Sequence, residues 1–310
     1  MSVAAREAFD LRSPFRLEDA LDVGLSLRAL RTKRFQRVFK GVYVAAEVPL
    51  DAATRARAAL LLHPEGAHAS HTTAALLLGI PVPDESFVHV TVGRAEDRNY
   101  RPGLKPHVRE GGSDVVLVDG IRVSAPLQLL VELAATLPLV DAVVAIDAML
   151  RLKLVTLAQL WNYCDRLQGQ RNSRSARRVL TYAREDVDSP METRVRMLLV
   201  LAGLPEPKVA FKIVDDDGVV LRRLDLCYPE IRLIVEYDGR HHIERVQQWV
   251  SDLDRREEFD QGDWRIIVVT SAGIYKDPAR TIRRVRDALR SRGVRVRGVS
   301  DAWRAHFPTR

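Results

Sequence analysis

Two acidic residues, Asp225 and Glu236, lie in a segment whose pattern predicts a β-hairpin. Two aliphatic runs with alternating polar positions flank a break at Pro229-Glu230. If residues 229–232 form the loop, antiparallel pairing places Asp225 directly opposite Glu236. Residues opposed in this way have Cβ atoms roughly 4.5 to 5.5 Å apart, so both carboxylates can hold one cation. Without a cation or a shared proton, their repulsion would drive one carboxylate toward its neutral form.

The composition is that of an ordinary soluble globular protein. The chain has 310 residues, of which 46% are hydrophobic and 29% are charged, and this length is enough for about two domains. The net charge of +7 favours an anionic partner, and nucleic acid is the commonest such partner. The balance of 48 basic and 41 acidic residues is equally compatible with a mixed, solvated surface.

The spacing of the cysteines and the lengths of the apolar runs indicate a cytoplasmic location. Cys164 and Cys227 are far apart and have no paired spacing typical of a zinc site or a disulfide framework, which favours a reducing environment. Residues 1–16 lack the apolar core of a signal peptide, and runs such as 58–62 and 74–78 are too short to cross a bilayer. We therefore expect a cytoplasmic protein with no membrane partner.

The N-terminal part of the chain has the pattern of a winged helix-turn-helix over about residues 14–46. A short helical pattern ends at Gly24, and Ser26 is a favourable N-cap for a second helix over residues 27–34. A hairpin pattern over residues 35–44 follows. Six basic residues fall on the second helix and the hairpin: Arg28, Arg31, Lys33, Arg34, Arg37 and Lys40.

These six basic side chains are candidates for contact with DNA. The second helix of a helix-turn-helix enters the major groove, and the hairpin of a winged helix lies beside it. The alternative interpretation is a solvated basic face, since runs of charge usually have that role. Their concentration on one helix and one hairpin favours DNA binding.

The same region resembles the abortive-infection type IV antitoxin family. The segment 29–44, which ends in Phe-Lys-Gly-Val-Tyr-Val, is similar to that family's winged helix running into its Gly-Val-Tyr strand. The segments 67–81, 88–92 and 118–123 continue the likeness, which covers about residues 14–151. The resemblance implies a winged helix followed by an α/β region, with DNA as the partner.

Several histidines lie between these segments without a repeated ligand spacing. They are His63, His68, His71 and His89, set among apolar and small residues. We interpret them as structural histidines, and metal binding is the alternative. The polar, turn-rich segment 186–190 then predicts a domain boundary, with an N-terminal domain over 1–188 and a C-terminal domain over 189–310.

A helix start opens the C-terminal domain. Ser189 is placed to be the N-cap, Pro190 occupies the first helical position, and Glu192 stands three residues after the cap, which completes a capping box. Capping alone would explain the glutamate at this position. The segments that follow suggest a second role.

The C-terminal domain resembles the Vsr-like branch of the restriction-endonuclease-like fold, over about residues 189–292. The expected order is the helix with Glu192, a strand at 211–214, the acidic hairpin, a helix at 244–259, a strand at 264–270 and a last helix at 278–292. The residues that carry the likeness are Arg223-Leu224-Asp225-Leu226, Val235-Glu236-Tyr237-Asp238-Gly239, His241-His242, Asp252, Arg255 and the run 263–267. The resemblance implies a mixed sheet flanked by helices, so the fold class expected for the whole chain is α/β in the α+β sense.

The resemblance also implies roles for individual residues. Asp225 and Glu236 would bind a divalent cation, with Glu192 supporting it. Asp238 together with His241 or His242 would orient the attacking water. Asp252 and Arg255 would lie near the site, although residues three apart on a helix also form simple ion pairs. Carboxylate ligands suit Mg²⁺ or Mn²⁺.

The sequence departs from the parent signature at Asp238, where the parent fold has lysine two residues after the second acid. Asp238-Gly239 is also an ordinary turn dipeptide. The loss of a general base would cost a factor of about 10² to 10⁴ in rate. From the acidic residues and the resemblance we expect a metal-dependent DNA endonuclease. The departure at Asp238 leaves a catalytically inactive DNA-binding regulator or antitoxin-like protein as an alternative, and an enzyme that acts on RNA is another.

Overall fold

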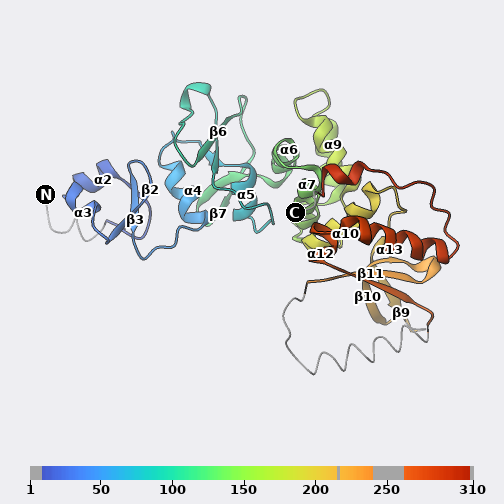
Figure 1. Cartoon of the computed structure of the whole chain (residues 1–310). Coiled ribbons are helices and arrows are strands. Elements are labelled where there is room, and N and C mark those ends of the chain that lie inside the picture. Colours follow the sequence, from blue (N-terminus) through green and yellow to red (C-terminus); the bar gives the residue numbers. More distant parts are fainter. Residues whose placement is uncertain (1–8, 215–216, 240–261, 308–310) are drawn as a thin grey trace. The chain divides into compact units, whose positions relative to one another are not determined.

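The computed structural model describes residues 9–214, 217–239 and 262–307 (Figure 1). The chain divides into two compact units. One contains residues 1–137 and 163–176, and the other contains 138–162 and 177–310. The described part of the chain combines helices with three sheets, two of which mix parallel and antiparallel strands, and this confirms the expected α+β class.

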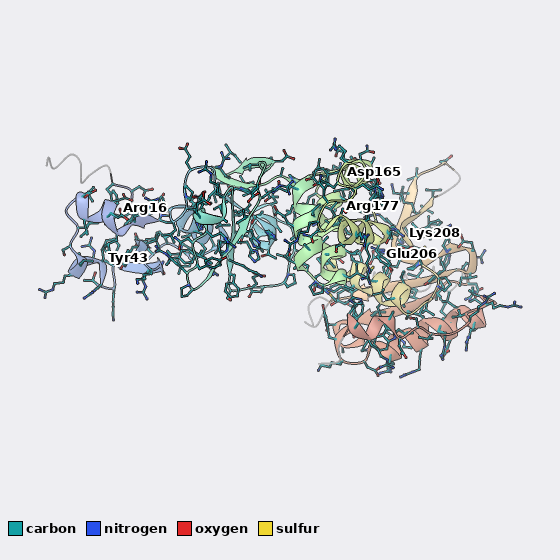
Figure 2. The ribbon with its side chains drawn as sticks, turned by 90° about the horizontal axis from the view of Figure 1, so that it is seen from above. Arg16, Tyr43, Asp165, Arg177, Glu206 and Lys208 are labelled. Carbon is teal, nitrogen blue, oxygen red and sulfur yellow. The ribbon has the colours of Figure 1, made fainter. Side chains whose placement is uncertain are left out.

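The N-terminal region of the first unit is a small antiparallel sheet with two short helices. Its elements are β1 (Phe15–Arg16), α2 (Leu17–Asp22), α3 (Leu27–Leu30), β2 (Phe35–Phe39) and β3 (Val42–Ala45), and the strand order is β1-β3-β2. Arg16 and Tyr43 come from the neighbouring strands β1 and β3 (Figure 2). Phe15, Ala20 and Leu30 form a buried cluster, and Tyr43 packs against it.

The structure confirms Ser26 as an N-cap, because its side chain accepts a hydrogen bond from the Ala29 amide at 3.1 Å. The helix that it caps is shorter than the expected 27–34. The Thr32 hydroxyl donates to the Ala29 carbonyl at 2.7 Å, and the turn that follows leads into β2. The expected hairpin is confirmed, with Gly41 in the left-handed region at its turn (φ +83°).

The rest of the first unit is built on a mixed five-stranded sheet in the order β6-β5-β4-β8-β7. Its elements are α4 (Ala52–Leu60), β4 (His68–Ala69), α5 (His71–Leu77), β5 (Val88–Val92), η1 (Ala95–Asp97), β6 (Leu104–Val108), β7 (Val115–Val118), β8 (Ile121–Ser124) and α6 (Pro126–Thr136). Every residue of β5 is buried. This is the pattern of a strand covered on both faces.

The second unit contains a four-stranded sheet in the order β12-β11-β10-β9. Its elements are α7 (Leu139–Arg151), α10 (Pro190–Leu201), β9 (Lys208–Val214), β10 (Val220–Tyr228), η2 (Pro229–Ile231), β11 (Leu233–Asp238), β12 (Arg265–Thr270), α12 (Ser271–Tyr275), α13 (Pro278–Ser291) and η3 (Ala302–Ala305). The remaining helices are α8 (Leu157–Arg166) and α9 (Ser173–Tyr182). The expected strands and last helix are confirmed within three residues, and the expected hairpin is confirmed with a first strand that begins at Val220, four residues before the expected Leu224.

A buried ion pair joins α7 to α10 in the second unit. Arg196 is fully buried, and one of its guanidinium nitrogens lies 2.8 Å from Oδ2 of Asp147. The Thr193 hydroxyl donates to the same oxygen at 2.8 Å, and the Arg184 amide donates to Oδ1 at 2.7 Å. Because α7 and α10 belong to the same compact unit, the domain boundary expected between residues 188 and 189 does not separate the two units. A functional boundary at that point stays a prediction.

None of the helices that the structure describes is both long enough and apolar enough to cross a membrane.

Candidate active site

The register of the acidic hairpin agrees with the sequence prediction. The pairs between β10 and β11 are Leu226 with Val235, Cys227 with Ile234, and Tyr228 with Leu233. The loop runs through η2 to Arg232, which adopts the left-handed conformation (φ 51°). The same register extended by one residue places Asp225 opposite Glu236, and both of these side chains are half-buried.

The acidic residues alternate with buried aliphatic ones. Val235 on β11 and Ile267 on β12 pair in parallel and are almost completely buried. Side chains two residues apart on a strand share a face, so Glu236 and Asp238 project to the same side of β11. Asp238, at the end of this strand, is exposed.

Glu192 lies in the first turn of α10, as the capping pattern predicts. The Ser189 hydroxyl oxygen accepts from the Glu192 amide at 3.2 Å, which confirms Ser189 as the N-cap. The Glu192 carboxylate accepts from the Asp188 amide at 3.1 Å, one residue before the cap, instead of from the amide of Ser189. Only 6% of Glu192 is exposed, so its carboxylate is held in a fixed, buried position.

Arg223 fixes the start of α10 against β10. Its guanidinium forms an ion pair with Asp188 and donates to the Asp186 carbonyl at 2.6 Å. Arg223 and Asp225 are two residues apart on one strand and therefore share a face. The segment that holds Glu192 thus lies along the face of β10 that carries Asp225. Arg223 was part of the sequence resemblance, but its anchoring role has no sequence signal.

The pKa of Glu192 agrees with a position of its carboxylate close to Asp225. Burial raises the pKa of Glu192, and the neighbouring negative charges of Asp225 and Asp188 raise it further. Three elements, α10, β10 and β11, therefore bring acidic groups to one region of the sheet. A divalent cation would relieve the repulsion between these groups, and oxygen ligands of this kind suit Mg²⁺ or Mn²⁺.

Several predicted site residues lie outside the described part of the chain. They are His241, His242, Asp252 and Arg255, together with the helix expected at 244–259.

The six candidate DNA-contacting residues are all exposed. Arg28 lies on α3, and Arg31 is the residue that ends it. Lys33 and Arg34 lie in the turn after α3, Arg37 lies on β2, and Lys40 lies at the hairpin turn. The basic residues therefore form a surface made of a short helix, a turn and a hairpin, because α3 is too short to carry four of them as expected.

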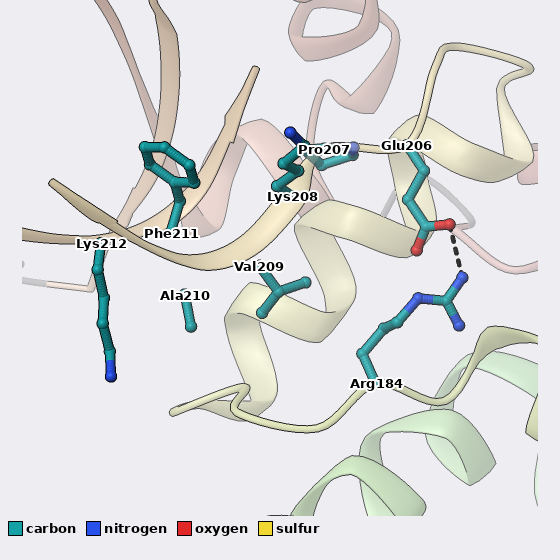
Figure 3. Close-up of a pocket in the computed structure, with 8 residues that line it drawn as sticks. All are labelled: Arg184, Glu206, Pro207, Lys208, Val209, Ala210, Phe211 and Lys212. Carbon is teal, nitrogen blue, oxygen red and sulfur yellow. Dashed lines mark hydrogen bonds and ion pairs between the residues drawn. The ribbon is translucent and has the colours of Figure 1, made fainter. Parts of the chain in front are cut away.

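A cavity of about 600 Å³ in the second unit lies along β9 (Figure 3). Its lining includes Lys208, Phe211 and Lys212 of this strand, and Arg184 forms an ion pair with Glu206 at 2.6 Å across it. None of the predicted carboxylates lines this cavity. We assign no role in the candidate active site to it.

The first unit contains a group of residues that sequence reasoning did not bring together: His71, His89 and His107. His71 and His89 were interpreted separately as structural, and His107 was not singled out. The three come from α5, β5 and β6, and no short ligand spacing connects them. Only the pairing of β5 with β6 and the position of α5 place them side by side.

His63 and His68 are buried, as expected of structural histidines, and Nε2 of each has no hydrogen-bond partner among the described residues. Burial lowers the pKa of His68 from 6.5 to about 4. Unfolding therefore takes up a proton below the unfolded pKa, so stability is full above it and is lost as the pH falls toward the folded value.

We expect a free energy of unfolding that falls more steeply on acidification in the wild type than in His68→Gln. Between about pH 7 and pH 5 the wild type should lose about 1 to 2 kcal/mol more of its free energy of unfolding than His68→Gln loses. Urea denaturation followed by circular dichroism at both pH values measures it. His306→Gln, which removes a half-buried histidine near the C-terminal end of the described chain, is the comparison and should have the smaller effect. Parallel losses in the wild type and His68→Gln would contradict the assignment.

No protein-family model matches the chain. Two curated relatives from Mycobacterium tuberculosis, uncharacterized protein MT2308 of strain CDC 1551 and uncharacterized protein Rv2248 of strain H37Rv, are each 28% identical over 253 residues. These matches cover 80% of this chain and 90% of each relative. A crystal structure of the RV2827C protein from the same species matches 69% of this chain and 86% of its own, with 15% identity and a TM-score of 0.40. The chain is thus similar over most of its length to mycobacterial proteins whose names state no activity.

Proposed function

We propose that this protein is a metal-dependent endonuclease that hydrolyses phosphodiester bonds in DNA. The observation that carries the proposal is the approach of Glu192 at the start of α10 to Asp225 on β10, beside the β11 position of Glu236. This arrangement supports the resemblance to Vsr-like endonucleases. A DNA substrate inside the cell agrees with a cytoplasmic location.

The residues have distinct roles in the proposed reaction. Asp225 and Glu236 would hold the ion from two neighbouring strands, and the buried Glu192 would support it from α10. Mg²⁺ or Mn²⁺ at this position would neutralise charge on the phosphoryl oxygens and lower the pKa of bound water. Asp238, together with His241 or His242, would orient the water.

Asp238 favours a second candidate function. The resembled fold has lysine at this position, and an exposed aspartate cannot replace its positive charge. A chain that binds DNA without cleaving it would act as a DNA-binding regulator or an antitoxin-like protein. The two candidate functions differ only in whether the bound DNA is cleaved.

Incubation of the full-length protein with supercoiled plasmid tests the proposal directly. We expect nicked or linear products with Mg²⁺ or Mn²⁺ and intact plasmid with EDTA. The second candidate replaces the first if the protein binds DNA but leaves plasmid, mismatched and branched substrates intact with both metals. Cleavage of RNA alone would replace DNA as the substrate.

The basic surface of the N-terminal region makes a separate prediction. Removing the charges of Arg28, Arg31 and Arg34 together should weaken DNA binding. It should also lower the salt dependence of binding, with the slope of log K against log salt falling by about 0.9 for each arginine that contacts a phosphate. Gel-shift titrations at several salt concentrations measure both effects.

The matched control removes three exposed arginines elsewhere in the chain, Arg151, Arg166 and Arg174. The two triple variants have the same net charge. Equal effects of both on affinity and salt slope would show that overall charge, and not this surface, attracts the DNA.

A further inference from the structure

Three histidines of the first unit meet at the edge of a cavity. His71 is the first residue of α5, His89 lies on β5 and His107 lies on β6, which pairs in parallel with β5. One ring nitrogen from each lies within 4.8 Å of the others. His71 and His89 are buried, and His107 is half-buried.

Neighbouring side chains orient two of the rings. His89 Nε2 contacts the Glu85 carboxylate, and His89 Nδ1 lies 2.9 Å from His107 Nε2. His71 Nδ1 lies 2.9 Å from the Ser70 hydroxyl and 3.8 Å from Oε2 of Glu132. The outer nitrogen of each of these two rings is therefore tied to an oxygen. Histidines that ligate metals usually donate their other ring N–H to an oxygen acceptor such as a carboxylate.

The backbone also holds His71 in place. Its φ of 51° lies in the left-handed region, which a residue other than glycine seldom adopts. The His71 amide donates to Oε2 of Glu132 at 2.8 Å, while Oε1 accepts from Ser124 at 2.9 Å and from Gln128 at 2.6 Å. This buried network fixes the His71 backbone, from which the side chain reaches the other two histidines.

We propose that His71, His89 and His107 form a binding site for a divalent transition-metal ion, with Zn²⁺ as the ion that best fits three imidazole ligands. The ligand atoms are His71 Nε2, His89 Nδ1 and His107 Nε2. Zinc with three protein ligands keeps its fourth position for water or another ligand. This site lies in the first compact unit and is independent of the carboxylates on α10, β10 and β11.

Two of the proposed ligand atoms are in contact with each other. The 2.9 Å distance between His89 Nδ1 and His107 Nε2 is that of a hydrogen bond, so one of these nitrogens carries a proton. That proton must move to the other nitrogen of its ring before both rings can bind an ion, because a metal ligand needs a free lone pair.

The cavity beside the cluster supplies room for a fourth ligand. Its volume is about 790 Å³, and its lining includes His71, His107, Thr91 and Arg109. Thr91 is 2% exposed, and its hydroxyl has no hydrogen-bond partner among the described residues. Buried hydroxyls are normally hydrogen-bonded, so this one indicates a water or ligand in the cavity.

Metal binding requires the His71 and His107 rings to separate and reorient. His71 and His107 stack with centroids 3.7 Å apart and an angle of 18° between their planes. Lone pairs lie in the ring planes, so two stacked rings cannot both point at one ion. A tetrahedral site with bonds of about 2.0 to 2.1 Å needs nitrogens about 3.4 Å apart. The rings must therefore tilt apart at their far edges as their nitrogens converge.

Cobalt spectroscopy and zinc titration of the full-length protein test the site. We expect tight binding of Zn²⁺ in competition with a chromophoric chelator, and visible absorption bands of tetrahedral Co²⁺ on substitution. His107→Gln should lower zinc affinity at least about 100-fold, and Glu85→Gln by about 10- to 100-fold, because it removes only a partner behind a ligand. Glu230→Ala, which removes an exposed acid outside both proposed metal sites, should leave both signals unchanged.

His107→Cys gives a positive signal that does not depend on the loss of binding. A thiolate at this position should retain Co²⁺ and add a sulfur-to-metal charge-transfer band in the near ultraviolet. His63→Gln, a substitution of a buried histidine outside the cluster, is the control for general effects on folding. The site is refuted if the wild type binds neither ion, if His107→Gln binds zinc as tightly as the wild type, or if cobalt bound to the His107→Cys variant gives no charge-transfer band.

Discussion

Asp225→Ala should reduce metal-dependent DNA cleavage by more than about 100-fold, since even a residue behind a metal ligand contributes about 10- to 100-fold. The substitution removes a carboxylate from the face of β10 that Arg223 and the start of α10 share. The hairpin should keep its structure, because its core is formed by other residues such as Leu224 and Ile234. Plasmid cleavage rates with Mg²⁺ and Mn²⁺ measure the loss.

The matched control for this experiment is Glu230→Ala. Glu230 is an exposed acid in the loop of the same hairpin, and it pairs with Lys208 at 2.5 Å outside the candidate site. Both variants lose one negative charge from one hairpin. We expect full activity in Glu230→Ala, and equal rates in the two variants would remove Asp225 from the active site.

Asp147→Ala should lower the free energy of unfolding of the second unit by about 3 to 5 kcal/mol. The substitution removes the closest carboxylate of the fully buried Arg196 guanidinium, which keeps only Glu206 at 3.1 Å, and a buried charge that loses a close partner is strongly destabilising. The Thr193 hydroxyl and the Arg184 amide lose their acceptor as well. Urea denaturation followed by tryptophan fluorescence measures the change, because all four tryptophans belong to the second unit.

Two further variants separate pairing from simple loss of an acid. Asp287→Ala removes an exposed acid paired with Arg286 and should cost at most about 1 kcal/mol. The double variant Asp147→Leu with Arg196→Met removes both buried charges and should be more stable than Asp147→Ala alone. A double variant as unstable as the single one would show that the charge of Arg196 is not the source of the loss.

The sequence by itself determined the local features of this protein. The two helix starts at Ser26 and Ser189 followed from capping residues, whose hydrogen bonds lie within one turn. The pairing of Leu226 with Val235 followed from the loop length, because a short loop fixes the register of the two strands beside it. These features depend on residues that are near neighbours in the chain, and they include the expected juxtaposition of Asp225 with Glu236.

Only the tertiary structure decided the features that join distant residues. The helix after Ser26 ends at Leu30, where a turn leads to the strand that pairs with β3. Arg223 reaches back to Asp186 and Asp188, and this contact sets the position of Glu192 against β10.

The histidine cluster and the buried pair of Arg196 with Asp147 also join residues that are far apart in the sequence. His71, His89 and His107 become neighbours through strand pairing, and Asp147 meets Arg196 through the packing of α7 on α10. Neither group has a spacing that periodicity or capping rules can detect. The physical reason is that hydrogen bonds within a turn or a short loop are encoded in neighbouring residues. Contacts between distant segments depend on which surfaces of the whole chain are buried together.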